Sequence, residues 1–340
     1  MQAPQRTHPW THCWAIALLC ALVCLPVLTS NAQAQSAATW PIPGKTIRIV
    51  LPFPAGGAGT DMMARLIGKK LSDDVGVPVV VDNKPGASTI IGAQEVAKAA
   101  PDGHTLFYTV VITHTQNPHL FAKLPYDPFK DFTPLSQVAR SATVLIAGKN
   151  APFDDLKGMI AHAKANPGKL NIASFSAGST AHINAEMLRI ASGVNIAHIP
   201  YKGVADAQRA LLAGEVQLYF DGTATAVTAI KAGTAKGIAA ATDKRISVLP
   251  ELPTITEQGV AGIDIVGWQG FFGPGGMDPA VTQKISAAIA KIVKSDEITN
   301  LIKTQGNEPT GTTADAFQTI VKTDFERWGN VIRRTGIKLE

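Results

Sequence analysis

The feature that most constrains the fold is a regular alternation of strand-like and helix-like segments that begins near residue 47. Short β-branched runs are followed by loops rich in glycine or serine, and then by stretches whose apolar residues recur at helical spacing. Such alternation predicts an α/β protein with mostly parallel sheets flanked by helices. The clearest predicted strands are residues 47–50, 104–112, 143–148, 170–174, 195–200, 216–221 and 236–241, and the clearest helices are 90–99, 153–165, 181–191, 205–212, 226–231 and those after 279.

Two long irregular passages interrupt this alternation and indicate that the chain crosses twice between two lobes. One crossing is expected near residues 139–143 and the other near 266–274. We therefore predict a first lobe of residues 35–142 plus 268–340 and a second lobe of residues 143–267. Removing residues 1–34 from the 340 leaves 306, which is enough for two domains of ordinary size.

The N-terminus has the pattern of a secretory signal peptide. WAIALLCALVCLPVL, residues 14–28, is an apolar run of fifteen residues, whereas about 20 are needed to span a bilayer. An A-Q-A cleavage pattern follows at residues 32–34. We predict that residues 1–34 are removed and that the mature chain is periplasmic; an uncleaved membrane anchor is the alternative. The predicted signal contains all three cysteines, Cys13, Cys20 and Cys24. The mature chain would therefore have no disulfide and no thiolate metal site.

Charge and composition indicate a small-molecule protein rather than a nucleic-acid-binding one. Hydrophobic residues make up 46% of the chain and charged residues 17%, with a formal net charge of +5. The lysines are scattered instead of gathered into a basic patch, so no nucleic-acid partner is expected. A mild positive balance suits an anionic small ligand.

The loop after the first predicted strand is a candidate anion site. PFPAGGAGTD, residues 52–61, joins a strand to a helix and contains three glycines. A dinucleotide fingerprint would need a third glycine at Met62, where close helix–strand packing is required, and no phosphate-loop lysine is present. Asp61 is better explained as a helix cap or a first-turn acid than as a nucleotide contact. A small carboxylate therefore fits this loop better than a pyrophosphate.

A second candidate anion site lies in the other predicted lobe. ASFSAGSTAH, residues 173–182, leaves a strand and enters a helix with several hydroxyls. Hydroxyls and free backbone N–H groups at a helix start form a neutral cradle for an anion. The competing explanation is that these serines only cap the helix, and the sequence leaves both possibilities open.

No catalytic set is evident in the sequence. The histidines after residue 34 are dispersed without a metal-ligand spacing, and there is no G-x-S-x-G elbow. We therefore expect no metal, no cofactor and no enzymatic activity. A secreted α/β hydrolase that acts on a small carboxylated substrate is the alternative.

The chain resembles the Bug-type periplasmic receptors of the tripartite tricarboxylate transporter system. The resemblance rests on stretches that occur in order through nearly the whole chain after residue 34: IRIVLPFPAGG, NKPGASTIIGA, APDGHTLFYT, NPHLFAKLPYDPFKDFTPL, AKANPGKLNIASFSAGSTAH, HIPYKG, LPELPTITEQG and WQGFFGP. It implies a two-lobed type II (Venus flytrap) fold that closes on a small organic carboxylate. It also implies delivery of that ligand to membrane permease subunits, and we expect a monomer.

The resemblance further implies that loop amides and ordered water hold the carboxylate largely without arginine or lysine. In this sequence three residues, 58–60, separate the glycine pair from Asp61, where two are expected. The implied ligand-binding residues are Phe53, Ala55, Gly56, Gly57 and Asp61 in the first lobe, Thr113, His114 and Gln116 in the cleft wall, and Ser174, Phe175, Ser176, Gly178, Ser179, Thr180 and Asp221 in the second lobe.

Overall fold

The structure is a computed structural model that describes residues 1–2, 39–56 and 59–339. The predicted signal peptide, apart from its first two residues, and the predicted ligand residue Gly57 lie outside the described residues. Residues 39–340 form one compact unit. Within the described part of the chain, no helix has both the length and the apolar character needed to cross a membrane.

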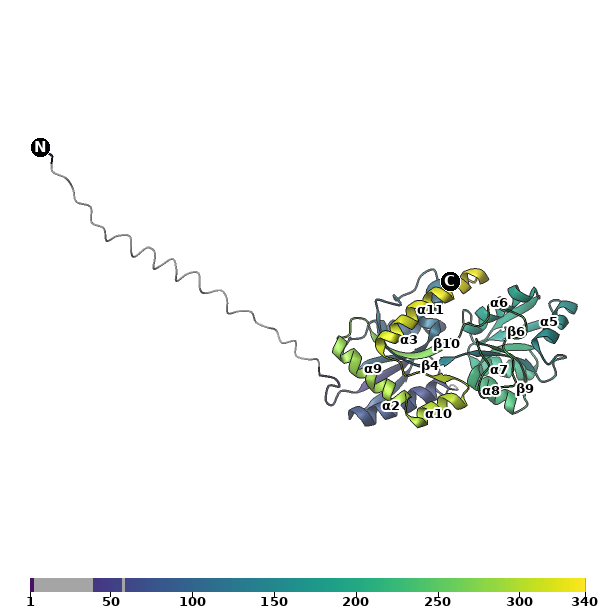
Figure 1. Cartoon of the computed structure of the whole chain (residues 1–340), viewed down its shortest axis with the longest axis horizontal. Coiled ribbons are helices and arrows are strands. Elements are labelled where there is room, and N and C mark those ends of the chain that lie inside the picture. Colours follow the sequence, from purple (N-terminus) through teal and green to yellow (C-terminus); the bar gives the residue numbers. More distant parts are fainter. Residues whose placement is uncertain (3–38, 57–58, 340) are drawn as a thin grey trace. The chain divides into compact units, whose positions relative to one another are not determined.

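The first lobe is built on a mixed sheet in the order β11-β4-β10-β3-β1-β2. Figure 1 labels β4 and β10 of this sheet, and β6 and β9 of the sheet in the second lobe. Strand β1 pairs in parallel with β2 and β3, whereas β10 runs antiparallel to both β3 and β4. The strand bounds are Ile47–Leu51 (β1), Val79–Asn83 (β2), Thr105–Val110 (β3), Phe132–Ser141 (β4), Gly267–Pro274 (β10) and Glu308–Pro309 (β11).

The second lobe repeats this plan in the order β7-β6-β8-β5-β9. Strand β6 pairs in parallel with β7 and β8, and β5 runs antiparallel to β8 and β9. In each sheet, therefore, one antiparallel strand lies between two strands that run in the opposite direction. The bounds are Thr143–Gly148 (β5), Leu170–Ser174 (β6), Ile196–Pro200 (β7), Leu218–Gly222 (β8) and Ala235–Ala241 (β9).

The chain passes between the two sheets at two places. Strand β4 ends at Ser141 and β5 begins at Thr143, so Ala142 alone separates them. The return connection covers residues 242–266, and residues 267–274, which were expected to form a crossing, are strand β10 of the first sheet. The lobe limits predicted from the sequence stay a proposal, and this division of strands supports it.

The helices begin and end close to where the periodicity predicts. Several helices begin after a capping residue, such as Asp155 before α5 and Asp278 before α9. Two short turns, η1 (Ala87–Thr89) and the π-helical η2 (Ile112–Gln116), precede α3 and α4. The helix bounds are Thr60–Val75 (α2), Ile90–Ala97 (α3), Asn117–Leu120 (α4), Leu156–Ala165 (α5), Thr180–Ser192 (α6), Val204–Ala213 (α7), Thr223–Lys231 (α8), Pro279–Val293 (α9), Asp296–Thr304 (α10) and Ala314–Thr335 (α11).

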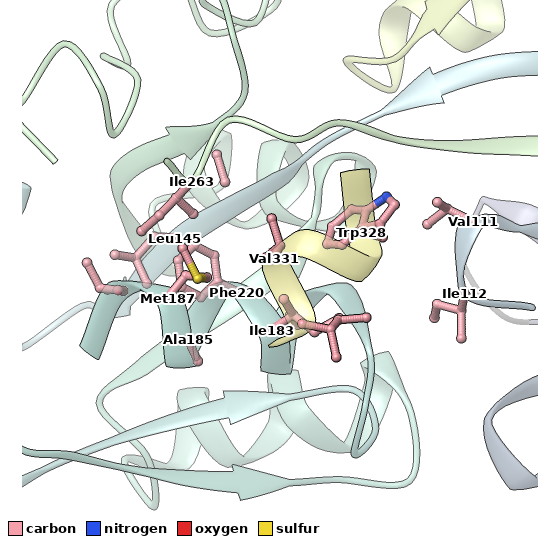
Figure 2. Packing of buried hydrophobic residues seen from close by; sticks show 14 of the residues in the cluster. Val111, Ile112, Leu145, Ile183, Ala185, Met187, Phe220, Ile263, Trp328 and Val331 are labelled. Carbon is pink, nitrogen blue, oxygen red and sulfur yellow. The ribbon is translucent and has the colours of Figure 1, made fainter. Parts of the chain in front are cut away.

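The C-terminal helix α11 joins the cores of the two lobes. It packs against β4 and η2 of the first lobe and against α6 of the second. Figure 2 shows Trp328 and Val331 of α11 between Ile183 and Met187 of the second lobe and Val111 and Ile112 of the first. All six belong to one buried hydrophobic cluster, so the end of the chain is part of both lobes' packing.

Candidate functional site

The loop after β1 is held in place by one buried carboxylate. Asp61 accepts hydrogen bonds from the Gly56 N–H (3.1 Å), from two nitrogens of Arg65 (2.9 and 3.0 Å) and from Asn83 Nδ2 (2.9 Å). The hydrogen bonds from Arg65 are the main reason that the pKa of Asp61 is lowered to about 2. Asp61 lies in the first turn of α2, and the cap position is Gly59. The carboxylate therefore positions the loop, which leaves it little capacity to contact a ligand.

The exposed part of this loop is its tip. Ala55 and Gly56 are exposed and Phe53 is half-buried. The Phe53 carbonyl accepts a hydrogen bond from Asn83 Nδ2 (3.0 Å), so β2 supports the loop from beside it. Asn83 was not among the residues that the sequence singled out, because its support acts across two strands.

The loop after β2 has an unusual backbone. Ala87, Ser88 and Thr89 all have positive φ (45°, 51° and 77°). For residues with a Cβ this conformation costs roughly 1–2 kcal/mol each. Tertiary contacts maintain it: the hydroxyls of Thr89 and Thr113 lie 2.8 Å apart, and Asn117 Nδ2 donates to the Ser88 carbonyl (2.8 Å).

The residues predicted to form the cleft wall are buried in η2. Thr113 bonds to the hydroxyl of Thr109 (2.7 Å) as well as to Thr89. Gln116 Nε2 reaches across to the second lobe and donates to Thr180 Oγ1 (2.9 Å). Thr113 and Gln116 thus join neighbouring loops through their side chains.

His114 has a different environment from the one expected. Its ring stacks on Phe272 (centroids 3.8 Å apart, planes at 9°) and meets the edge of Phe132. The side chain is fully buried, and neither ring nitrogen has a hydrogen-bond partner among the described residues. Burial lowers the pKa of His114 to about 3, which keeps it neutral. These contacts indicate a packing role in the first lobe instead of a ligand contact.

The loop after β6 combines helix capping with two backbone N–H groups that have no acceptor among the described residues. Ser179 caps α6: its Oγ accepts from the His182 N–H (3.3 Å) and donates to the Ser176 carbonyl (2.7 Å). No described residue accepts a hydrogen bond from the N–H of Ser176 or Ala177. Ser176 is half-buried, as is Phe175 beside it. The loop therefore contains both features that the sequence left as alternatives, on different residues.

Two histidines outside the predicted ligand set bond to this loop. The Gly178 N–H donates to His182 Nδ1 (3.0 Å), and Ser174 Oγ lies 2.7 Å from His198 Nε2. Local sequence did not show that the two rings lie together, because they come from α6 and β7 and meet only in the folded chain.

Asp221, at the end of β8, has an internal role. It is fully buried and accepts hydrogen bonds from the Gly222 N–H (2.7 Å), Thr225 Oγ1 (2.6 Å) and Gln208 Nε2 (2.8 Å). Burial raises its pKa to about 6. These contacts organise the start of α8, so they give no support to a direct ligand contact.

Loops of the two lobes meet face to face. Ser88 Oγ donates to the Ala177 carbonyl (3.2 Å), and a Cβ placed on Gly59 would lie 4.0 Å from that of Ala224. The meeting loops follow the carboxyl ends of β1, β2 and β3 on one side and of β6 and β8 on the other. In open α/β sheets this edge is where ligands bind. Fold and loops together define a two-lobed solute-binding protein of the type II class.

Comparison with known proteins identifies the family within this class. The model of the tripartite tricarboxylate transporter family receptor matches residues 63–337, and the chain belongs to that family. The fold matches the periplasmic binding protein BugD with a TM-score of 0.81 at 31% identity, over 88% of this chain and 100% of BugD.

Two further solved structures of similar proteins contain ligands. The R. palustris protein Rpa4515 with adipate matches with a TM-score of 0.83 at 33% identity, over 88% of this chain and 99% of that one. MatC from Rhodopseudomonas palustris with bound malate matches with a TM-score of 0.78 at 31% identity, over 86% of this chain and 100% of MatC. The receptors of this family are periplasmic and bind solutes. The chain is accordingly a receptor, and the hydrolase alternative is set aside.

Proposed function

We propose that this receptor binds a small organic carboxylate between its lobes and delivers it to the permease subunits of a tripartite transporter. The observation that carries the proposal is the pair of N–H groups on Ser176 and Ala177, which have no acceptor among the described residues and lie in the loop that meets the first lobe. Adipate and malate, held by the two similar proteins, are both dicarboxylates. The mature chain would act in the periplasm as a monomer after loss of residues 1–34.

Backbone N–H groups and hydroxyls would supply most of the binding energy. Hydrogen bonds to a charged acceptor are each worth about 1.5–3 kcal/mol. The α2 and α6 N-termini next to the two loops add a favourable dipole for an anion. Asp61, His114 and Asp221 would support the site from behind. Direct contacts are assigned to residues with exposed or half-buried surface and to the predicted ligand residue Gly57; they are Phe53, Ala55, Gly56, Gly57, Phe175, Ser176 and Ala177.

The bonds between the lobes are assigned to the closed, ligand-bound arrangement. Ser88 to Ala177 and Gln116 to Thr180 both join loops of different lobes. A ligand that bridges these loops would favour closure through contacts made only in that state. A fall in the radius of gyration on ligand addition, measured by small-angle X-ray scattering, is the expected result.

A thermal-shift screen tests the ligand class. Mono-, di- and tricarboxylates, aromatic acids and acidic amino acids should be compared with neutral sugars, and each stabilising ligand recovered unchanged after incubation. Stabilisation should follow RT ln(1 + [L]/Kd), about 2.7 kcal/mol at a hundredfold excess over Kd. Stabilisation by a sugar but by no carboxylate would overturn the proposal, and so would chemical conversion of the ligand.

A charge placed on the proposed amide cradle tests the site. Ser176→Asp should weaken carboxylate binding more than about a hundredfold, because like charges in contact cost several kcal/mol. Ser176→Asn has nearly the same shape without the charge and is the matched control. Lys202→Ala, at an exposed lysine, should leave affinity nearly unchanged. If Lys202→Ala abolished binding while Ser176→Asp did not, the carboxylate would be bound by a lysine side chain, and the proposal of an amide cradle would be wrong.

Delivery to a permease needs a cellular test. A strain that lacks the receptor should lose uptake of the stabilising carboxylate, and uptake should return with the wild-type chain but not with Ser176→Asp. Normal uptake in the deletion strain would refute the transport role while leaving ligand binding intact.

A further inference from the structure

Two histidines of the second lobe stack face to face beside the Ser174–Thr180 loop. The ring centroids of His182 and His198 lie 3.8 Å apart, with their planes at 6°. His182 belongs to α6 and His198 to β7, and both are half-buried. Each ring makes one hydrogen bond to this loop, His182 to Gly178 and His198 to Ser174.

The hydrogen bonds define the protonation states. Nδ1 of His182 accepts the Gly178 N–H, so this nitrogen carries no proton and the ring proton is on Nε2. Ser174 Oγ donates to the Ser176 carbonyl (2.9 Å), so His198 Nε2 donates to Ser174 Oγ. His182 is therefore neutral, and burial, which lowers the pKa of His198 to about 3, keeps the second ring neutral as well.

A proton on His182 would break the contact to the loop. The one free site for it is Nδ1, where a new N–H would point at the N–H of Gly178 and remove the acceptor. The resulting imidazolium would also lie against the neighbouring ring at 3.8 Å. Gly178 has φ +71° and belongs to the turn that presents Ser176 and Ala177, so the change would reach the proposed ligand amides directly.

Few charges act on the pair. The elements packed around the pair are β6, β7, β8, α6 and α11. Among their described residues, the charge of Glu186 favours protonation of His182. Glu186 is itself paired with Arg189 (2.8 Å). Burial lowers the pKa of His182 from its usual 6.5. Burial, and secondarily the neighbouring His182, lowers the pKa of His198 to about 3. His182 is therefore the first of the two to titrate as the pH falls.

We infer that the His182–His198 pair is a proton-sensitive clamp that holds the Ser174–Thr180 loop in its ligand-binding conformation. Neutral rings keep the loop in place, and protonation of His182 releases it. The link to ligand affinity rests on the proposed function, whereas the link to loop conformation does not. His182 and His198 are positioning residues, because they act on the ligand through the loop.

The loop can be followed without any ligand. In a ¹⁵N-labelled protein titrated from pH 7.5 to 4.5, the Gly178 amide resonance should shift together with the His182 ring signals. In His182→Asn, the side-chain oxygen can replace Nδ1 as acceptor but takes up no proton, so the Gly178 resonance should stay nearly constant. His162→Gln is the control, since the His162 ring on α5 lies beside Phe153 (centroids 5.6 Å apart) and makes no hydrogen bond to the loop. A wild-type Gly178 resonance that does not move by pH 4.5 would overturn the inference even if His182→Asn failed to fold.

Affinity for malate and adipate completes the test. Wild-type Kd should rise about tenfold for each pH unit below the pKa of His182, and His182→Asn should lose this dependence, while protonation of the ligand itself affects both proteins equally. If the Gly178 resonance titrates as expected but neither acid binds, the clamp stands and the proposed ligand class fails. If either acid binds with the same pH dependence in wild type and His182→Asn, the clamp is refuted and the proposed function stands.

Discussion

Replacing His114 by phenylalanine should make the protein less sensitive to acid. In the folded chain the pKa of His114 is about 3, so the ring stays neutral down to that pH, whereas in the unfolded chain the pKa has its usual value of 6.5. The stability that depends on the neutral ring is therefore fully present above pH 6.5 and is lost as the pH falls toward 3. At pH 5, which is 1.5 units below 6.5, the loss is about 2 kcal/mol at 1.36 kcal/mol per unit.

The mutation also changes stability at neutral pH, through two opposing contributions. Removing two buried nitrogens that have no partner among the described residues relieves a desolvation cost of about 1–3 kcal/mol. A phenyl ring is larger than an imidazole, and overpacking beside Phe272 and Phe132 costs a similar amount. The informative quantity is thus the change between two pH values, in which these contributions cancel.

Urea unfolding of wild type and His114→Phe at pH 7.5 and pH 5.0 measures this pH-dependent change in the free energy of unfolding. The free energy of unfolding of wild type should fall about 2 kcal/mol further than that of His114→Phe. The other titrating groups are present in both proteins and do not affect the difference. Equal losses would show that His114 is protonated in the folded state or exposed to water, and would refute the buried, neutral assignment. Carboxylate affinity at pH 7.5 should be unchanged; a large loss would restore His114 as a ligand contact.

Three smaller changes test other parts of the structure. Ser179→Ala should lower the free energy of unfolding by about 1 kcal/mol through loss of the α6 cap, with Kd nearly unchanged in isothermal titration; a tenfold weaker Kd would make Ser179 a ligand contact. Asp61→Asn should lower the free energy of unfolding by about 1.5–3 kcal/mol at pH 7. Wild type should lose stability as the pH falls from 3.8 to about 2, and the variant should not; chemical denaturation at several pH values measures both effects. Ala87→Gly should hardly change the free energy of unfolding, because φ is already +45° and glycine adopts this angle freely. Ala287→Gly within α9 is the comparison and should lower it by about 1 kcal/mol. Equal losses of stability in thermal melts would contradict the left-handed backbone at Ala87.

Local pattern determined most of the secondary structure and the position of the proposed ligand loops. The segments 143–148 and 170–174 form β5 and β6 as predicted, because runs of β-branched and apolar residues favour strands wherever both faces are buried. The loops after β1 and β6 lie where the two lobes meet, since the carboxyl ends of parallel strands share one edge. Strand β4 was missed because its polar and proline residues obscure the pattern, and pairing with β10 decides its structure.

Tertiary structure alone decided what individual side chains do. The family resemblance placed Asp61 and Asp221 among the ligand residues, yet in the folded chain their carboxylates accept hydrogen bonds from Arg65 and Gln208. The His182–His198 stack joins a helix to a strand, and the positive φ angles of residues 87–89 depend on contacts with η2 and α4. A sequence expresses preferences over a few neighbouring residues, whereas burial and hydrogen-bond partners come from residues far apart in the chain, and they exist only once the chain has packed.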